Sequence, residues 1–221
     1  EPGVGRALGQ VLVIETRPGA SGMIGTEVVA HADPDGHTVL LVDSSFAINP
    51  ALQPRLPYDP LRDFIPTCFL ATGATVLLVH PALGVATLAE LIALARARPG
   101  RLGYASGGNG TGPHLAGELL KMMAGIDLLH VPYRGTGPAT NDVVAGHVPV
   151  MFNGTSAAIP HVQAGRLRAL AVTGAARNRA LPDVPTFAEA GLPGLDASGN
   201  WSVFAPARTP DGVVRRLADA F

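Results

Sequence analysis

The chain has 221 residues, 47% of them hydrophobic and 15% charged, and sixteen basic against seventeen acidic residues give a formal net charge of −1. This composition excludes a disordered chain, which could not bury enough apolar surface to offset its ordering entropy. It also leaves no electrostatic footprint for nucleic acid or an anionic membrane. The most apolar stretch, from Phe64 to Ala95, is interrupted by prolines and glycines and predicts no membrane span. The single cysteine, Cys68, permits no internal disulfide and no multi-cysteine metal site.

Short β-branched and apolar runs recur along the chain and predict eight strands. Most of these runs are continuously apolar rather than alternating, which is typical of strands covered on both faces. The predicted strands are Val11–Ile14, Thr38–Val42, Thr75–Val79, Leu102–Ser106, Leu128–Tyr133, Val148–Phe152, Leu167–Thr173 and Trp201–Ala205. Because helical patterns lie between the runs, the connections should be right-handed crossovers, and the expected fold is α/β with mainly parallel sheets.

Capping residues mark where several of the helices should begin. Thr87 and Glu90 have the spacing of a capping box, and apolar residues follow them at helical intervals. A second capping box, Thr186–Glu189, predicts another helix, and further helices are expected after Pro138 and after Ser156.

A helix that begins near Pro113 and ends at Gly125 is expected in the middle of the chain. Its apolar residues Leu115, Leu119, Met122 and Met123 are predicted to be buried. The methionines are interpreted as core packing rather than as part of a cofactor site.

Two segments, residues 17–25 and 107–114, share one organisation: a predicted strand, a glycine-rich turn and the start of a helix. Glycine lets the backbone approach a ligand closely and adopt positive φ, so that amide N–H groups converge. A helix start adds about half a positive charge at the same place. Neither turn contains lysine or the spacing of a dinucleotide fingerprint. Together they are interpreted as an anion clamp, with a purely structural tight turn as the alternative for each.

Ordered motifs extend over nearly the whole sequence. They include Val13-Ile-Glu-Thr-Arg-Pro-Gly-Ala20, Asp33-Pro-Asp-Gly-His-Thr38, Tyr58-Asp-Pro-Leu-Arg-Asp-Phe64, Tyr104-Ala-Ser106, His130-Val-Pro-Tyr-Arg-Gly135, Ala169-Leu-Ala-Val-Thr173 and Leu181-Pro-Asp-Val-Pro-Thr-Phe-Ala-Glu-Ala-Gly191. In this series the chain resembles the substrate-binding proteins of tripartite tricarboxylate transporters, the Bug-type family.

The resemblance implies a two-lobed α/β fold similar to type II periplasmic binding proteins, with a mainly parallel sheet flanked by helices in each lobe and a ligand cleft between the lobes. Residues 1–78 and 197–221 are expected to form the first lobe and residues 79–196 the second. The family's chain has a strand, a loop and a helix ahead of the strand matched by Val11–Ile14, and helices after Phe221. The native chain is therefore expected to be longer than 221 residues, with the first lobe here lacking its N-terminal strand.

The resemblance also implies a function, that of a periplasmic receptor that closes by a hinge on a small organic carboxylate. The expected ligand is a di- or tricarboxylate or a related, possibly aromatic, acid, which the receptor delivers to the membrane permease subunits. No cofactor, metal ion or nucleic acid is expected, the chain should not be embedded in the membrane, and a monomer is expected. A receptor of the same fold for a two-component sensor is the alternative. A hydrolase using Ser21, Ser106 or Ser156 with His114 is disfavoured, because the sequence has no nucleophile-elbow motif.

The candidate ligand contacts follow from the two loops and the resemblance. In the first lobe they are Gly19, Ala20, Ser21, Gly22, Ser44 and Ser45. In the second lobe they are Ser106, Gly107, Gly108, Asn109, Gly110, Thr111, His114, Tyr133, Arg134, Gly135, Thr136 and Asn153, the last at the carboxyl end of its strand.

Several of these residues have a structural alternative. Arg134 either pairs with a carboxylate or is solvated. His114 either binds ligand or packs at its helix start, and Tyr133 offers either its hydroxyl or only its ring. Family members usually carry a polar pair where this chain has Ser45-Phe46. A Phe46 ring in the cleft would favour a ligand with an apolar or aromatic body.

Overall fold

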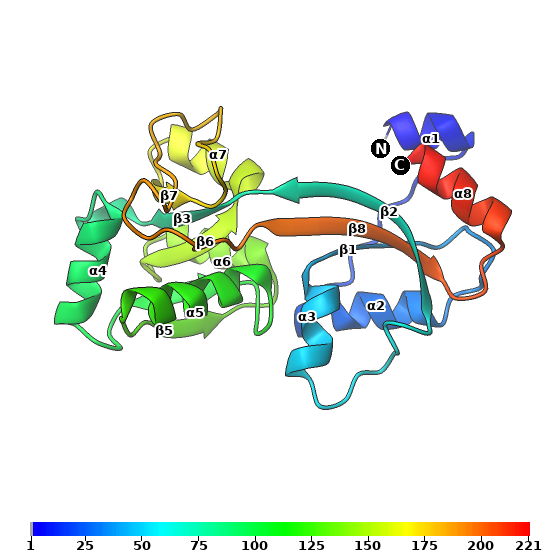
Figure 1. The fold of residues 1–221 in the computed structure, drawn as a ribbon, viewed down its shortest axis with the longest axis horizontal. Helices are drawn as coiled ribbons and strands as arrows, with labels where there is room; N and C mark the ends of the chain where they lie inside the picture. The colour runs from blue at the N-terminus through cyan, green and yellow to red at the C-terminus, as the bar shows by residue number, and fades with distance from the viewer. Residues whose placement is uncertain (1) are drawn as a thin grey trace. The chain divides into compact units, whose positions relative to one another are not determined.

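The computed structural model describes residues 2–221 and divides the chain into two compact units (Figure 1). One unit comprises the residues up to Thr72 together with Asn200–Phe221, and the other comprises Gly73–Gly199. Strands and helices alternate along most of the chain, so the predicted α/β class is confirmed. Among residues 2–221, no helix is both long and apolar enough to cross a membrane.

The second unit is built on a five-stranded sheet in the order β5-β4-β6-β3-β7. The strands are β3 (Thr75–Val79), β4 (Gly103–Ser106), β5 (Leu129–Pro132), β6 (Val150–Gly154) and β7 (Arg168–Val172). β4 is parallel to β5 and β6, whereas β3 is antiparallel to both β6 and β7. All strands except β3 therefore share one direction, and the expected mainly parallel sheet is found in this unit.

Both faces of this sheet are buried. Successive residues of β3 point to opposite faces, so Leu77 and Val79 join one apolar cluster, while Val76 and Leu78 join another. The first cluster is covered by α4 (Leu88–Ala97) and α5 (Gly112–Ala124), the second by α6 (Thr136–Val144) and α7 (Thr155–Gln163). The short helix η2 (Pro81–Leu83) links β3 to the segment before α4. Continuous apolarity thus correctly predicted a strand covered on both sides.

The first unit has a smaller sheet with a different topology. Its strands β1 (Leu40–Asp43), β8 (Gly199–Pro206) and β2 (Phe64–Gly73) lie in the order β1-β8-β2. β1 and β8 are antiparallel, and the arrows of β2 and β8 run in opposite directions in Figure 1. The expectation of a mainly parallel sheet is wrong for this unit. Its helices are α1 (Pro2–Leu8), η1 (Ala20–Gly22), α2 (Met23–Ala30), α3 (Ser45–Leu52) and α8 (Asp211–Ala220).

Two predictions in the first unit are wrong. Val11–Ile14 is not a strand, and its side chains Val11, Val13 and Ile14 are 89%, 87% and 67% exposed. Apolar β-branched residues favour a strand only where a neighbouring strand is available to pair, and none of the described strands pairs with this segment. β2 was not predicted, because its residues are mostly exposed or half-buried and Pro66 and Thr67 interrupt the apolar pattern.

The chain passes between the units at 72/73 and 199/200, not at the expected 78/79 and 196/197. β3 lies wholly in the second unit, because it is hydrogen-bonded to β6 and β7 over its length. Only Ala74 separates β2 from β3, so the sequence has no loop or linker that would mark where the chain leaves the first unit.

The two capping boxes have different outcomes. The Thr87 hydroxyl accepts the Glu90 amide at 3.2 Å and begins α4, as predicted. The Glu189 carboxylate accepts the Thr186 amide at 2.7 Å and the Thr186 hydroxyl accepts the Glu189 amide at 3.2 Å, but no helix follows. A single turn forms there, and Gly191, with φ of 92°, ends it.

The prediction for α5 is confirmed in part, since Leu119 and Met123 pack against the apolar cluster, but the fully buried residues are others. Its buried residues are Ala116, Gly117, Leu120 and Ala124, whereas Leu115, Leu119 and Met123 are half-buried and Met122 is 74% exposed. Small residues face the sheet because the fully buried Tyr104 ring lies against Gly117. A Cβ atom on Gly117 would stand 2.2 Å from Tyr104 Cε2.

The variant Gly117→Ala should therefore lower the free energy of unfolding by about 1–3 kcal/mol, since the buried ring has to shift. Gly112→Ala on the same helix is the matched control, because a Cβ there meets nothing within 4 Å. Urea denaturation of both variants measures the difference. Equal stability of the two variants would contradict the packing described for Tyr104.

Candidate functional site

The glycine-rich turn of the second unit, residues 107–111, joins β4 to α5 and is held by its own hydrogen bonds. The Thr111 hydroxyl donates to Gly108 O at 2.8 Å, and the Gly110 amide donates to His114 Nδ1 at 3.1 Å. Gly108 and Gly110 have φ of 133° and 82°, values that disfavour other residues. The Thr111 side chain caps no amide of α5, so the first turn of this helix offers N–H groups to an anion.

A second turn, Tyr133 to Thr136, lies against the first. The Tyr133 amide donates to Ser106 O and the Gly135 amide to Gly107 O, both at 3.0 Å. A Cβ on Gly107 would be 2.9 Å from Thr136 Oγ1 and 3.0 Å from Thr136 N. Gly107 is therefore required for the close approach of the two turns.

Tyr133 and Arg134 have different surroundings on this second turn. The Tyr133 hydroxyl donates to Asp142 Oδ2 on α6 at 2.6 Å, and its ring packs against the apolar cluster beneath. Burial and the Asp142 carboxylate raise the pKa of Tyr133 to about 12. Arg134 is exposed, and no hydrogen bond or ion pair links its side chain to another residue of the described chain. Arg134 is therefore the cation available at this turn.

Asn153 is buried beneath these turns. Its Nδ2 donates to Thr140 Oγ1 at 3.1 Å, its Oδ1 accepts the Gly154 amide at 2.8 Å, and only 3% of the residue is exposed. Thr140 in turn donates to Thr136 O at 2.8 Å. Asn153 therefore supports the start of α6, and both its Nδ2 and its Oδ1 are hydrogen-bonded within the second unit.

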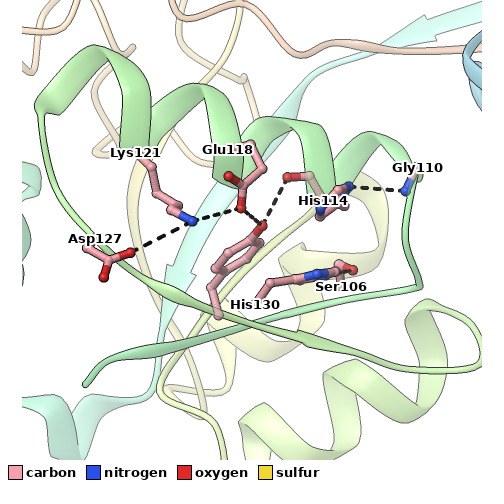
Figure 2. Close-up of polar contacts among 8 residues, drawn as sticks. Ser106, Gly110, His114, Glu118, Lys121, Asp127 and His130 are labelled. Atoms are coloured by element: carbon pink, nitrogen blue, oxygen red, sulfur yellow. Dashed lines mark hydrogen bonds and ion pairs between the residues drawn. The ribbon is translucent and has the colours of Figure 1, made fainter. Parts of the chain in front are cut away.

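Next to the glycine-rich turn lies a cluster of polar side chains that includes two histidine rings and one tyrosine ring (Figure 2). Ser106 Oγ lies 2.6 Å from His130 Nε2, and the rings of His114 and His130 are 4.2 Å apart at their centroids. On the other side, Tyr104 donates to Glu118 Oε1 at 2.7 Å, and Lys121 donates to the same oxygen at 3.1 Å.

Burial sets the protonation of this cluster. Burial, followed by the nearby His114, lowers the pKa of His130 to about 4. Burial also lowers the pKa of His114, while burial and the Glu118 carboxylate raise that of Tyr104. Both imidazoles and the phenol are therefore neutral at pH 7.

His130 was not among the predicted site residues. It enters the cluster because β4 and β5 are parallel neighbours in register, with Tyr104 opposite His130. The sequence signal was its place three residues before Tyr133 in the His130–Gly135 motif. Tyr133, Arg134 and Gly135 of that motif were predicted as site residues, whereas His130 was not.

The glycine-rich turn of the first unit has an unusual backbone. Gly19, Ala20, Ser21 and Gly22 have φ of 121°, 46°, 54° and 83°. The left-handed region costs an ordinary residue about 1–2 kcal/mol, so Ala20 and Ser21 must be held there by their surroundings. Asn49 Nδ2 on α3 donates to Ser21 O at 3.1 Å, and Thr26 Oγ1 on α2 donates to Gly22 O at 2.9 Å.

The hydroxyls of Ser44 and Ser45 are engaged within this unit. Ser45 Oγ and the Ser45 amide both donate to Asp43 Oδ1, and Ser44 Oγ accepts the Asn200 amide at 3.1 Å. Phe46 packs in an aromatic cluster, with its ring centroid 4.3 Å from that of Phe204. The aromatic cluster accounts for the Phe46 ring, so its place in the core gives no support to the idea that it favours an aromatic ligand.

Within each unit the structure brings most of the candidate residues together. In the first unit, Gly19–Gly22 and Ser45 lie close, since a Cβ on Gly22 would be 3.4 Å from Ser45 Oγ. In the second unit, the residues gathered at the carboxyl ends of β4, β5 and β6 are Ser106–Thr111, His114, Tyr133–Thr136 and Asn153.

The fold of this chain, with its two α/β units, is shared with solved solute receptors such as the periplasmic binding protein BugD, which is 32% identical with a TM-score of 0.95 over 99% of this chain and 73% of that one. The model of the tripartite tricarboxylate transporter family receptor, TctC, matches residues 1–221. The chain belongs to this family.

Individual relatives agree with this assignment. BugT of Bordetella pertussis is 37% identical over 210 residues, which cover 94% of this chain and 64% of BugT. Rpa4515 of R. palustris, solved with adipate, is 36% identical with a TM-score of 0.95 over 99% of this chain and 74% of that one. MatC of Rhodopseudomonas palustris, solved with bound malate, is 33% identical with a TM-score of 0.92 over 98% and 74%. The chain thus spans a little under two thirds of the length of curated relatives such as BugT.

The contact between Tyr133 and Asp142 can be tested by titration. The hydrogen bond from Tyr133, followed by that with His147, lowers the pKa of Asp142 below its ordinary value. In Tyr133→Phe the Asp142 pKa should rise, so the carboxylate's contribution to stability is lost at a higher pH as the solution is acidified. Carboxyl NMR titration measures this, with Glu189 as the control, whose lowered pKa depends first on Arg177. An unchanged Asp142 pKa would contradict the assigned contact.

Proposed function

We propose that the protein is a periplasmic receptor that binds a small organic carboxylate, a di- or tricarboxylate or a related acid, and delivers it to the membrane subunits of a tripartite tricarboxylate transporter. The receptor acts as a monomer and needs no cofactor or metal. The candidate ligand contacts are in the glycine-rich turn of each unit.

The observation that carries this proposal is the turn 107–111 with the uncapped start of α5. Backbone amides at a helix start suit a carboxylate, because they donate hydrogen bonds and carry partial positive charge without needing a lysine or a metal. The turn itself holds this helix start in place, since its Gly108 and Gly110 amides already donate to Ser106 Oγ and His114 Nδ1. The adjoining turn adds Arg134, whose guanidinium can bond both oxygens of a carboxylate.

The relatives support the ligand class. Adipate and malate, named for Rpa4515 and MatC, are both dicarboxylates, and these proteins share the fold of this chain at TM-scores of 0.95 and 0.92. A dicarboxylate has two anionic ends, which fits two amide-rich turns.

Hydrolysis is disfavoured by the surroundings of Ser106. Its hydroxyl is 2.6 Å from His130, but the residue is fully buried and its oxygen also bonds Gly108. In the described chain no carboxylate hydrogen-bonds His130, so the orienting acid of a catalytic triad is not in place.

A carboxylate panel tests the proposal. Adipate, malate, citrate and acetate are each added to the protein, and the melting temperature and the ligand concentration are followed. A ligand at 100 times its dissociation constant should stabilise the protein by about 2.7 kcal/mol, with no loss of ligand. No stabilisation by any carboxylate, or chemical conversion of one, would overturn the proposal.

Arg134→Gln tests the role of the second turn. Removal of a charge-assisted hydrogen bond costs about 1.5–3 kcal/mol, so the dissociation constant of the bound carboxylate should rise roughly ten- to hundredfold. Arg101→Gln is the matched control, since Arg101 is exposed and precedes the opposite end of β4. Calorimetric titration compares the two variants. An equal affinity of both would contradict a contact between Arg134 and the ligand.

A further inference from the structure

The imidazole of His114 forms part of the glycine-rich turn through a bond that depends on its protonation. The Gly110 amide donates to His114 Nδ1 at 3.1 Å, so this nitrogen must present a lone pair. A proton on Nδ1 would place two donors against each other and break the link between the turn and α5. The arrangement of residues 107–111 therefore requires a neutral His114.

His130 supports the same turn from below. Its Nε2 lies 2.6 Å from Ser106 Oγ, and Ser106 Oγ accepts the Gly108 amide at 3.1 Å. His130 thus contacts Gly108 through the Ser106 hydroxyl, whereas His114 bonds the Gly110 amide directly. Two histidines from different elements, α5 and β5, fix two glycines of one turn.

Few negative groups near His114 and His130 could stabilise a positive charge on either ring. The rings of His114 and His130 are 4.2 Å apart, so two imidazolium ions would repel each other, and Lys121 adds a third positive charge nearby. Among the described residues, Glu118 is the one carboxylate that acts on both rings, and its oxygen already accepts bonds from Tyr104 and Lys121. Tyr104 stacks on His130 at 4.9 Å, and Asp127 is 3.9 Å from Lys121.

We propose that His114 and His130 are positioning residues for the turn 107–111, that the turn keeps its arrangement only while both rings are neutral, and that proton uptake at His114 releases Gly110. The effect on carboxylate binding rests on the proposed function above. On that basis the receptor binds its ligand near neutral pH and loses affinity in acid through its own histidines.

The direction of the pKa shifts agrees with the geometry. Burial lowers the pKa of both rings below the value in an unfolded chain, and that of His130 falls to about 4. A lowered histidine pKa means that the unfolded chain takes up protons first as the pH falls. The stability contributed by the neutral pair is therefore complete above about pH 6.5 and declines through the acid range towards the folded pKa.

The first test uses the ligand-free protein. NMR spectra recorded as the pH is lowered from 7.5 follow the His114 ring and the Gly110 amide together. The Gly110 amide should shift with the same midpoint as His114, and that midpoint should lie below 6.5. A Gly110 amide that does not respond while His114 titrates would overturn the proposal. This measurement needs no variant, so it decides the matter even if a substituted protein fails to fold.

The second test compares affinities. His114→Asn places a non-titrating oxygen where Nδ1 was, and His31→Asn is the control, because His31 is exposed in the first unit. At one pH unit below the His114 midpoint only about one molecule in eleven keeps the neutral ring, so adipate affinity relative to His114→Asn should fall about tenfold. Protonation of adipate itself affects both proteins equally, so it cancels in the ratio of the two affinities. A constant ratio would contradict the proposal, whereas absence of adipate binding at pH 7.5 bears only on the proposed function.

Discussion

Parallel pairing of β4 with β5 continues past the ends of both strands, and the candidate site depends on it. The Tyr133 amide reaches Ser106 O, and the Gly135 amide reaches Gly107 O, so the turn after each strand follows its neighbour. Gly107 permits this because a side chain there would collide with Thr136. As a result the two turns lie side by side at the carboxyl edge of the sheet, where α/β proteins bind ligands.

The sequence predicted those parts of the fold that depend on local patterns. β3 is continuously apolar and is buried on both faces, and α4 begins where Thr87 caps it. Features that depend on a distant partner were not predictable in the same way. Val11–Ile14 has the composition of a strand but no pairing partner in the described chain, and the Thr186 capping box forms without a helix because Gly191 ends the first turn.

The candidate site shows the same division. The turn 107–111 was predictable, since its glycines and the following helix start are contiguous in the sequence. The roles of single side chains were not, because they are set by contacts between elements. His130 reaches Ser106 through strand register, Asn153 uses its amide inside the unit, and the hydroxyl of Tyr133 bonds Asp142. In the proposed site, buried side chains such as Ser106 and Asn153 fix the position of the backbone.

Amide chemical-shift mapping during a titration with adipate at pH 7.5 tests the central claim most directly, because it locates the carboxylate on the backbone. We expect the largest changes on the amides of residues 107–111 and of Gly19–Gly22, with Tyr133 to Thr136 next. Changes confined to other parts of the chain, with both glycine-rich turns unaffected at saturation, would contradict it.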